Sequence, residues 1–229
     1  MQRSSPALVR QILRHNRMSN VQMVPTLSTP PPPPGPPPPP PPGPPSNVFP
    51  LGSPCDVFPP GPPCDVFINH RGIDTKRTVA GLLNYHLASK LNLRPFLDSK
   101  NMKPGDRLFD KIDAAIRKCK LGMAVFSPQY CESYFCLHEL ALLMESKKRV
   151  IPVFCNVKPS QLRVKDNGVC PQYELERFSW ALEEAKYTVG LTFDSSKADW
   201  SEFLREASDA VMQNLLEIEG ERAYLREQC

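Results

Sequence analysis

One stretch of the chain, Ser133–Met144, combines a helical spacing of apolar residues with a single acidic side chain. Its apolar residues fall at i, i+3, i+4 and i+7 and predict one apolar helix face, formed by Leu137, Leu140, Ala141 and Met144. Glu139 follows Phe135 by four residues, so the two share a neighbouring face of the same helix. Two interpretations are open: Glu139 is a surface residue at the edge of the helix, or it is an acid group in a pocket.

Apolar runs of strand length alternate with helical patterns from residue 64 onward. We expect strands at Cys64–Asn69, Arg94–Leu97, Leu121–Phe126, Arg149–Cys155 and, as an edge strand, Tyr187–Phe193. We expect helices from Asp74 or Thr75 to about Leu91, and at Arg107–Lys118, Ser133–Met144, Glu174–Ala185 and Asp199–Ile218. The segment Asp98–Asp106 contains Pro104 and Gly105 and is expected to be a polar loop.

This alternation predicts an α/β fold, a flavodoxin-like three-layer sandwich with a five-stranded parallel sheet between two helix layers. Sheets of this kind bind ligands beyond the carboxyl ends of their strands. The segments that emerge there are Asn69–Thr75, Asp98–Asp106 and Ser127–Glu139. We therefore expect Arg71, the loop at Gly105 and Glu139 to surround a single crevice, which favours the pocket interpretation of Glu139.

The first 63 residues have a different composition from the rest of the chain. They hold 22 of the 28 prolines, and 14 of these lie in the run Pro30–Pro45. Residues 1–24 are expected to be a basic, disordered or weakly helical tail, with an organelle transit peptide as the alternative. Residues 25–63 predict a disordered Pro-rich linker in polyproline II conformation, which is either a spacer or a ligand for adaptor modules with aromatic grooves. We expect the folded domain at 64–218 and a short C-terminal tail at 219–229.

Charge and cysteine content exclude several classes of function. Residues 64–229 carry 24 basic and 23 acidic side chains, so no basic surface for nucleic acid is indicated. The eight cysteines follow no secretory segment, and several lie in apolar runs, which indicates a reducing compartment. Cys131, Cys136 and His138 match no usual zinc spacing, so no metal site is expected.

Four segments, taken together and in order, resemble the TIR domain of plants. They read CDVFINHRGIDTKRT (64–78), PFLDSKNMKPGD (95–106), AVFSPQYCESYFCLHEL (124–140) and VIPVFCNVKPSQLR (150–163). The resemblance covers roughly residues 64 to 218. Because no nucleotide-binding switch domain or leucine-rich repeat follows, the chain is similar to the TIR-only proteins of grasses and other plants.

The resemblance implies cleavage of NAD⁺ at the nicotinamide–ribose bond by self-associated protein. The implied products are nicotinamide and ADP-ribose, or a cyclic ADP-ribose isomer that serves as a signal in plant immunity and cell death. NAD⁺ is then a substrate, and no cofactor or metal is implied. The catalytic glutamate of the family matches Glu139, and its strand-end arginine matches Arg71. The other residues expected at the substrate are Gly72, Asp74, Thr75, Gly105 and Phe135.

The residue types suit this chemistry. Glycosyl cleavage passes through an oxocarbenium-like state. Nicotinamide leaves NAD⁺ as a neutral molecule, so one carboxylate, that of Glu139, is sufficient to stabilise the developing cation. Phe135 is placed to stack on the nicotinamide or the ribose, and Arg71 with amides near Gly72 to bind the pyrophosphate. As alternatives, Arg71 pairs with Asp74 only to hold the strand end, and Phe135 belongs to the core.

The chain departs from the family pattern at three places. Phe135 stands where the family usually has tryptophan, and His70 replaces a phenylalanine before Arg71. The Ser-His pair that many plant TIR domains use to self-associate aligns with Gly81 and Leu82.

A second class of function stays open, a non-catalytic adaptor that acts by homotypic TIR–TIR contacts. Contacts with other TIR proteins are compatible with either class, whereas neither a membrane nor nucleic acid is expected as a partner. We expect a cytoplasmic or nucleocytoplasmic protein, with organelle targeting by the N-terminal residues as the alternative.

Overall fold

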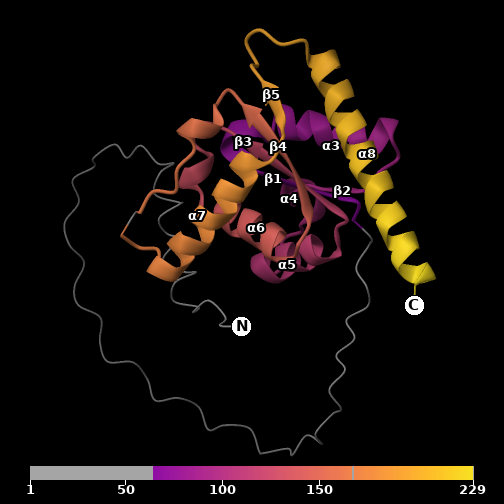
Figure 1. The fold of residues 1–229 in the computed structure, drawn as a ribbon. Helices are drawn as coiled ribbons and strands as arrows, with labels where there is room; N and C mark the ends of the chain where they lie inside the picture. The colour runs from indigo at the N-terminus through magenta and orange to yellow at the C-terminus, as the bar shows by residue number, and fades with distance from the viewer. Residues whose placement is uncertain (1–63, 167, 229) are drawn as a thin grey trace, which may run out of the picture. The chain divides into compact units, whose positions relative to one another are not determined.

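The computed structural model describes residues 64–166 and 168–228, so the expectations for the basic tail and the Pro-rich linker lie outside the described residues. Five strands form one sheet, and every pair of neighbouring strands is parallel (Figure 1). In sheet order β2-β1-β3-β4-β5 they are Pro95–Phe96, Val66–His70, Leu121–Phe126, Arg149–Cys155 and Leu191–Phe193. The α/β fold and the five-stranded parallel sheet predicted from the sequence are therefore confirmed.

Helices cover both faces of the sheet. One layer consists of α3 (Val79–Lys90) and α8 (Trp200–Glu227), which pack on Val66, Ile68 and other apolar residues of the strands. The opposite layer consists of α5 (Leu108–Lys118), α6 (Tyr134–Glu145) and α7 (Gln172–Tyr187) (Figure 1). The central strands β1 and β3 are buried along their whole length, which is why their sequences are almost continuously apolar.

The strand order places a topological switch between β1 and β3. The helix after β1 lies on one face of the sheet, whereas the helix after β3 lies on the other. The loops that follow these two strands therefore diverge at the carboxyl edge of the sheet, where ligands bind in such folds. Asn69 and Arg71 come from the first strand end, and Ser127 and Gln129 from the second.

Several predicted elements differ from those observed. The first helix is split into α2 (Gly72–Thr75) and α3, because the chain turns between Lys76 and Thr78 before the second helix begins. The expected polar loop after β2 opens with a short helix, α4 (Asp98–Asn101), whose Asn101 side chain accepts a hydrogen bond from Leu97 N. The edge strand is shorter than expected, because α7 continues to Tyr187.

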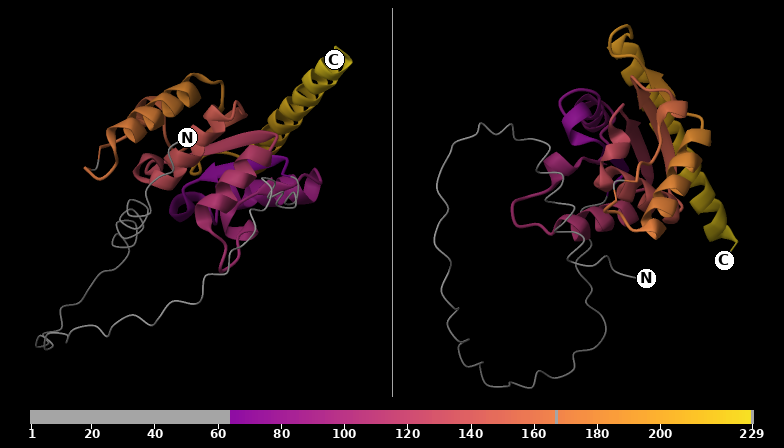
Figure 2. Two further views of the ribbon diagram at one scale, coloured as in Figure 1. Left: turned by 90° about the horizontal axis from the view of Figure 1, so that it is seen from below. Right: turned by 90° about the vertical axis from the view of Figure 1, so that its left-hand side faces the viewer.

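The last helix extends past the boundary predicted at residue 218. It continues to Glu227, so residues 219–227 are helical and not an irregular tail (Figure 2). Ion pairs hold the first part of this extension to the domain, since Lys120 reaches Glu219 at 2.9 Å and Arg149 reaches Glu221 at 2.6 Å. No helix in the described part of the chain is long and apolar enough to cross a membrane.

Candidate active site

Glu139 lies in the second turn of α6, with its side chain directed at the carboxyl end of β1. Ser133 begins the helix as its N-cap, and its hydroxyl accepts a hydrogen bond from Cys136 N at 3.4 Å. The next turn carries Glu139, which is only 8% exposed. A carboxyl group this deep is not the surface glutamate of the first interpretation, so the structure favours a group with a specific role.

Asn69 is the residue that holds Glu139. Its Nδ2 atom donates hydrogen bonds to Glu139 Oε2 at 2.8 Å and to the carbonyl of Cys136 at 3.1 Å. The fully buried Tyr130 hydroxyl donates a short hydrogen bond to Asn69 Oδ1 and lies 3.0 Å from the same carbonyl. The side-chain amide is therefore fixed in orientation, with its donors directed at α6.

Burial controls the protonation of Glu139. It raises the pKa of the carboxyl group to about 8, because the charged form loses its hydration. The hydrogen bond from Asn69 opposes this shift, whereas the negative charges of Asp98 and Asp113 reinforce it. A carboxyl pKa near 8 in a buried position is a recurrent feature of functional sites.

One carboxyl oxygen of Glu139 makes no hydrogen bond to the described part of the chain. Only Oε2 takes part in a hydrogen bond with the protein. In the described part of the chain, the single buried side-chain nitrogen or oxygen without a partner is His70 Nε2. Oε1 of Glu139 therefore keeps a small exposed surface, although the residue as a whole is buried.

Arg71 links the ends of β1 and β3. Its NH1 atom donates to Asp74 Oδ1 at 3.1 Å and to Gln129 Oε1 at 2.6 Å, and NH2 lies 3.7 Å from Glu132 Oε2. The alternative interpretation, that Arg71 pairs with Asp74 at the strand end, thus describes the arrangement seen here. An anion bound by Arg71 would have to replace part of these contacts.

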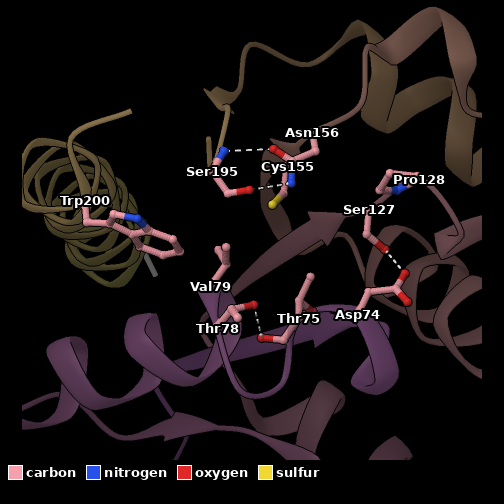
Figure 3. A pocket seen from close by; sticks show the side chains of 10 residues that line it. All are labelled: Asp74, Thr75, Thr78, Val79, Ser127, Pro128, Cys155, Asn156, Ser195 and Trp200. Carbon is pink, nitrogen blue, oxygen red and sulfur yellow. Dashed lines mark hydrogen bonds between the residues drawn. The ribbon is translucent and has the colours of Figure 1, made fainter. Parts of the chain in front are cut away.

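Asp74 and Thr75 face a cavity of about 190 Å³ at the carboxyl edge of the sheet (Figure 3). Ser127 donates a hydrogen bond of 2.5 Å to Asp74, and Asn156 and Ser195 are joined by two hydrogen bonds on the opposite side. Glu139 lines neither this cavity nor a larger one of about 360 Å³ beside β2. Arg71 is bonded to Asp74 on the side of the first cavity, and the single crevice expected around Arg71, Gly105 and Glu139 stays a prediction.

The remaining predicted site residues are Gly72, Gly105 and Phe135. Gly72 is the first residue of α2, next to Arg71, and a Cβ atom there would meet nothing within 4 Å. Gly105 is exposed with φ +95°, a conformation that favours glycine and that makes its loop a tight turn. Phe135 is half-buried and packs on Phe109 of α5, with ring centroids 5.4 Å apart.

Comparison with known proteins places this site in a family. The family model described as TIR domain matches residues 66–169. The chain is 52% identical over 156 residues to the probable 2′ cyclic ADP-D-ribose synthase BdTIR of Brachypodium distachyon, covering 66% of this chain and 69% of that protein. The chain belongs to the TIR domain family.

More distant relatives agree with this assignment. Identity to the TMV resistance protein N of Nicotiana glutinosa is 29% over 167 residues, which is 66% of this chain and 14% of that protein. Among solved structures, the TIR domains of the activated Roq1 resistosome superpose with a TM-score of 0.57 at 28% identity. That match covers 65% of this chain and 99% of the solved chain.

The structure of this TIR domain explains one departure from the family pattern. Gly81 lies so close to the preceding turn that a Cβ atom would be 2.5 Å from the carbonyl oxygen of Lys76. A serine or histidine at this position would therefore require the turn between α2 and α3 to move. The adjacent Leu82 is 40% exposed and is available at the surface.

Sequence reasoning missed three side chains of the site. Asn69 holds Glu139, Tyr130 bonds to the other end of the Asn69 amide, and Asp98 acts on the pKa of Glu139. A signal for Asn69 was present, since it is the one amide in an otherwise apolar central strand and faces the same side as Phe67. Asp98 and Tyr130 lie in loop-like segments whose approach to α6 no local pattern indicates.

Proposed function

We propose that this TIR domain cleaves NAD⁺ at the nicotinamide–ribose bond, with Glu139 as its catalytic residue. The observation that carries the proposal is the buried carboxyl group of Glu139, which Asn69 holds through only one of its two oxygens. The similarity to a protein named as a probable 2′ cyclic ADP-D-ribose synthase supports the reaction class. The products are nicotinamide and ADP-ribose or a cyclic ADP-ribose isomer.

The reaction needs one negative charge at the ribose. As the C1′–N bond breaks, its electron pair leaves with the ring nitrogen, so nicotinamide departs neutral and the ribose becomes an oxocarbenium-like cation. The carboxylate of Glu139 stabilises this charge and accepts hydrogen bonds from the ribose hydroxyls. Water then adds at C1′ and releases a proton, giving ADP-ribose, or a hydroxyl of the same molecule adds and gives the cyclic isomer.

Because the pKa of Glu139 is raised, the positive charge of bound NAD⁺ can promote ionisation of this carboxyl group. In the free protein near neutral pH, burial keeps most of the carboxyl groups protonated. The pyridinium of NAD⁺ is positive and favours the carboxylate when it binds beside it. The ionised form of Glu139 is therefore most populated when the nicotinamide–ribose bond of bound NAD⁺ lies beside it.

The remaining predicted residues bind the rest of the substrate. Arg71 exchanges its contacts with Gln129 and Glu132 for the pyrophosphate, assisted by amides near Gly72. Phe135 presents an aromatic ring next to the site for stacking on the nicotinamide half. Because the leaving group is already activated by its charge, no separate cofactor or metal takes part.

We propose further that the active form is self-associated. Glu139 borders neither of the two cavities described above, which favours a substrate pocket completed by a second copy or by a movement of the 98–106 segment. Exposed apolar side chains on α2 and α3, among them Ile73 at 70% and Tyr85 at 63%, offer a surface for such contacts. We propose that contacts with other TIR proteins use the same exposed apolar surface. We also propose that the protein acts in the cytoplasm.

The experiment mixes the full-length protein with NAD⁺ at stepwise increasing protein concentration and follows nicotinamide, ADP-ribose and cyclic isomers by mass spectrometry. Specific activity is expected to rise with concentration, and the Glu139→Gln variant is expected to release no nicotinamide above background. Absence of nicotinamide at every concentration of the wild type would contradict the proposal. If such inactive protein still bound another TIR protein, the adaptor function would replace it.

A further inference from the structure

His70 is the last residue of β1 and directly follows Asn69, whose amide holds Glu139. Its side chain is 2% exposed, and its backbone carbonyl accepts a hydrogen bond from the Cys136 thiol at 3.3 Å. The backbone of His70 is therefore fixed against the first turn of α6, in the element that also carries Glu139.

The protonation of the ring is determined by its contacts. Nδ1 lies 3.4 Å from the carbonyl oxygen of Ile68, which can only accept, so Nδ1 carries the proton. Burial lowers the pKa of the imidazole and outweighs the opposing negative charge of Asp98, so the ring is neutral. Nε2 is then a hydrogen-bond acceptor, and no group in the described part of the chain donates to it.

A second acceptor faces this nitrogen. Asp98 Oδ1 lies 3.9 Å from His70 Nε2, too far for a direct hydrogen bond. Asp98 is also close enough to Glu139 for its charge to act on that carboxyl group. Two acceptors that do not bond each other, beside the carboxyl group proposed to act on the ribose, form a site for a group with two hydrogens to donate.

We propose that His70 Nε2 and the Asp98 carboxylate together bind the carboxamide NH₂ of the nicotinamide ring. This inference rests on the proposed function and names the residues that determine which pyridine nucleotide is accepted. An NH₂ group donates one hydrogen to each acceptor, whereas a methyl ketone in its place donates none. A carboxylate in its place is repelled by Asp98. The TIR domain therefore prefers NAD⁺ to its acetylpyridine and nicotinic acid analogues.

The test compares NAD⁺ with 3-acetylpyridine adenine dinucleotide as substrates of the full-length protein. In the His70→Phe variant, which keeps a ring of similar size, kcat/KM for NAD⁺ is expected to fall about tenfold, through KM. For the acetylpyridine analogue, kcat/KM of this variant is expected to stay within twofold of the wild-type value. The ratio of kcat/KM for the two substrates is compared between wild type and variant. This comparison cancels the different reactivity of the two leaving groups. The matched control His86→Phe changes a histidine on α3 and leaves the ratio as in the wild type.

Asp98 provides an independent arm of the same experiment. Asp98→Asn is expected to increase kcat/KM for nicotinic acid adenine dinucleotide about tenfold relative to that for NAD⁺, since the repulsion is removed. If His70→Phe lowers the rates with both NAD⁺ and the acetylpyridine analogue equally, or if it lowers neither, the carboxamide assignment is wrong.

Failure of the proposed function would look different from failure of this inference. Wild-type protein would then cleave none of the three dinucleotides. In that case saturation-transfer NMR with free nicotinamide and 3-acetylpyridine decides the inference alone. Weaker binding of nicotinamide to His70→Phe, with binding of 3-acetylpyridine unchanged, supports the inference. Equal binding of both rings by both proteins overturns it.

Discussion

The side-chain amide of Asn69 donates a hydrogen bond of 2.8 Å to the carboxyl group of Glu139, joining the end of β1 to the second turn of α6. The two residues are 70 positions apart in the chain, so the bond forms only when the helix packs on the sheet. It partly offsets the burial that raises the pKa of Glu139. The protonation of Glu139 therefore depends on this contact as well as on burial.

The rate of NAD⁺ cleavage is expected to depend on pH through Glu139. The carboxylate is the active form, and its pKa in the free protein is about 8. We expect kcat/KM to rise nearly tenfold per pH unit from pH 6 to 7.5 and to level above pH 8.5. Initial rates between pH 6 and 9 measure this, and a profile that is flat or falls over the range would contradict the assignment.

The same pKa has a consequence for stability. Because it lies above the unfolded value, the folded state binds more protons between pH 4.5 and 8, and stability falls as pH rises through that window. Glu139→Gln removes the titration and keeps an acceptor for Asn69. We expect the variant to be more stable than wild type by about 4 kcal/mol at pH 8, with little difference at pH 4.

Urea denaturation at the two pH values measures the effect. The exposed Glu184→Gln serves as the control and is expected to change stability equally little at both. A Glu139→Gln variant that is less stable than wild type at pH 8 would show that the buried carboxylate is favourable in the fold.

Removing the Asn69 donor is expected to shift the pH profile. Asn69→Leu keeps the size of the side chain but takes away the bond that lowers the pKa of Glu139. The rise in kcat/KM should then move to higher pH by about one unit, which corresponds to one charged hydrogen bond. Tyr130→Phe is the matched control, since it loses the bond to Asn69 but leaves the Asn69–Glu139 contact. Tyr130→Phe should lower the free energy of unfolding by about 1 kcal/mol and leave the pH profile of kcat/KM unchanged.

Gly81 is expected to be required for the turn between α2 and α3. A Cβ atom at this position would lie 2.5 Å from the backbone oxygen of Lys76, whereas one at Gly220 in α8 would meet nothing within 4 Å. Gly81→Ala should therefore destabilise the domain by about 1–3 kcal/mol. Gly220→Ala should stabilise it by about 0.5–1 kcal/mol through helix propensity. Thermal unfolding of the two variants checks the pair, and an equal effect in both would contradict the account.

The fold was predictable because its signals are local. Continuous apolar strands such as Arg149–Cys155 and the helical spacing in α6 indicate a parallel sheet between helix layers without any tertiary information. The errors occurred where tertiary packing or short-range turns decide. The helix after β1 breaks between α2 and α3, and α8 continues past Ile218 because Lys120 and Arg149 hold its acidic residues.

The site was only partly predictable. Periodicity located Glu139 on a helix, and family resemblance supplied its role. The partners of Glu139 come from β1, from the turn after β3 and from the start of α4, so long-range packing decides which of them meet. Glu139 lies apart from the cavity at Asp74, because α6 packs on one face of the sheet whereas Val79 of α3, on the other face, lines that cavity. No spacing in the sequence carries that information.

The most direct measurement is the rate of nicotinamide release by full-length wild-type and Glu139→Gln proteins at equal, high concentration. Gln keeps the shape of the side chain and the contact with Asn69 but cannot become negative. A loss of at least about a hundredfold in kcat, with thermal unfolding showing a folded variant, is the predicted result. A variant that releases nicotinamide within twofold of the wild-type rate would contradict the assignment of Glu139 as the catalytic residue.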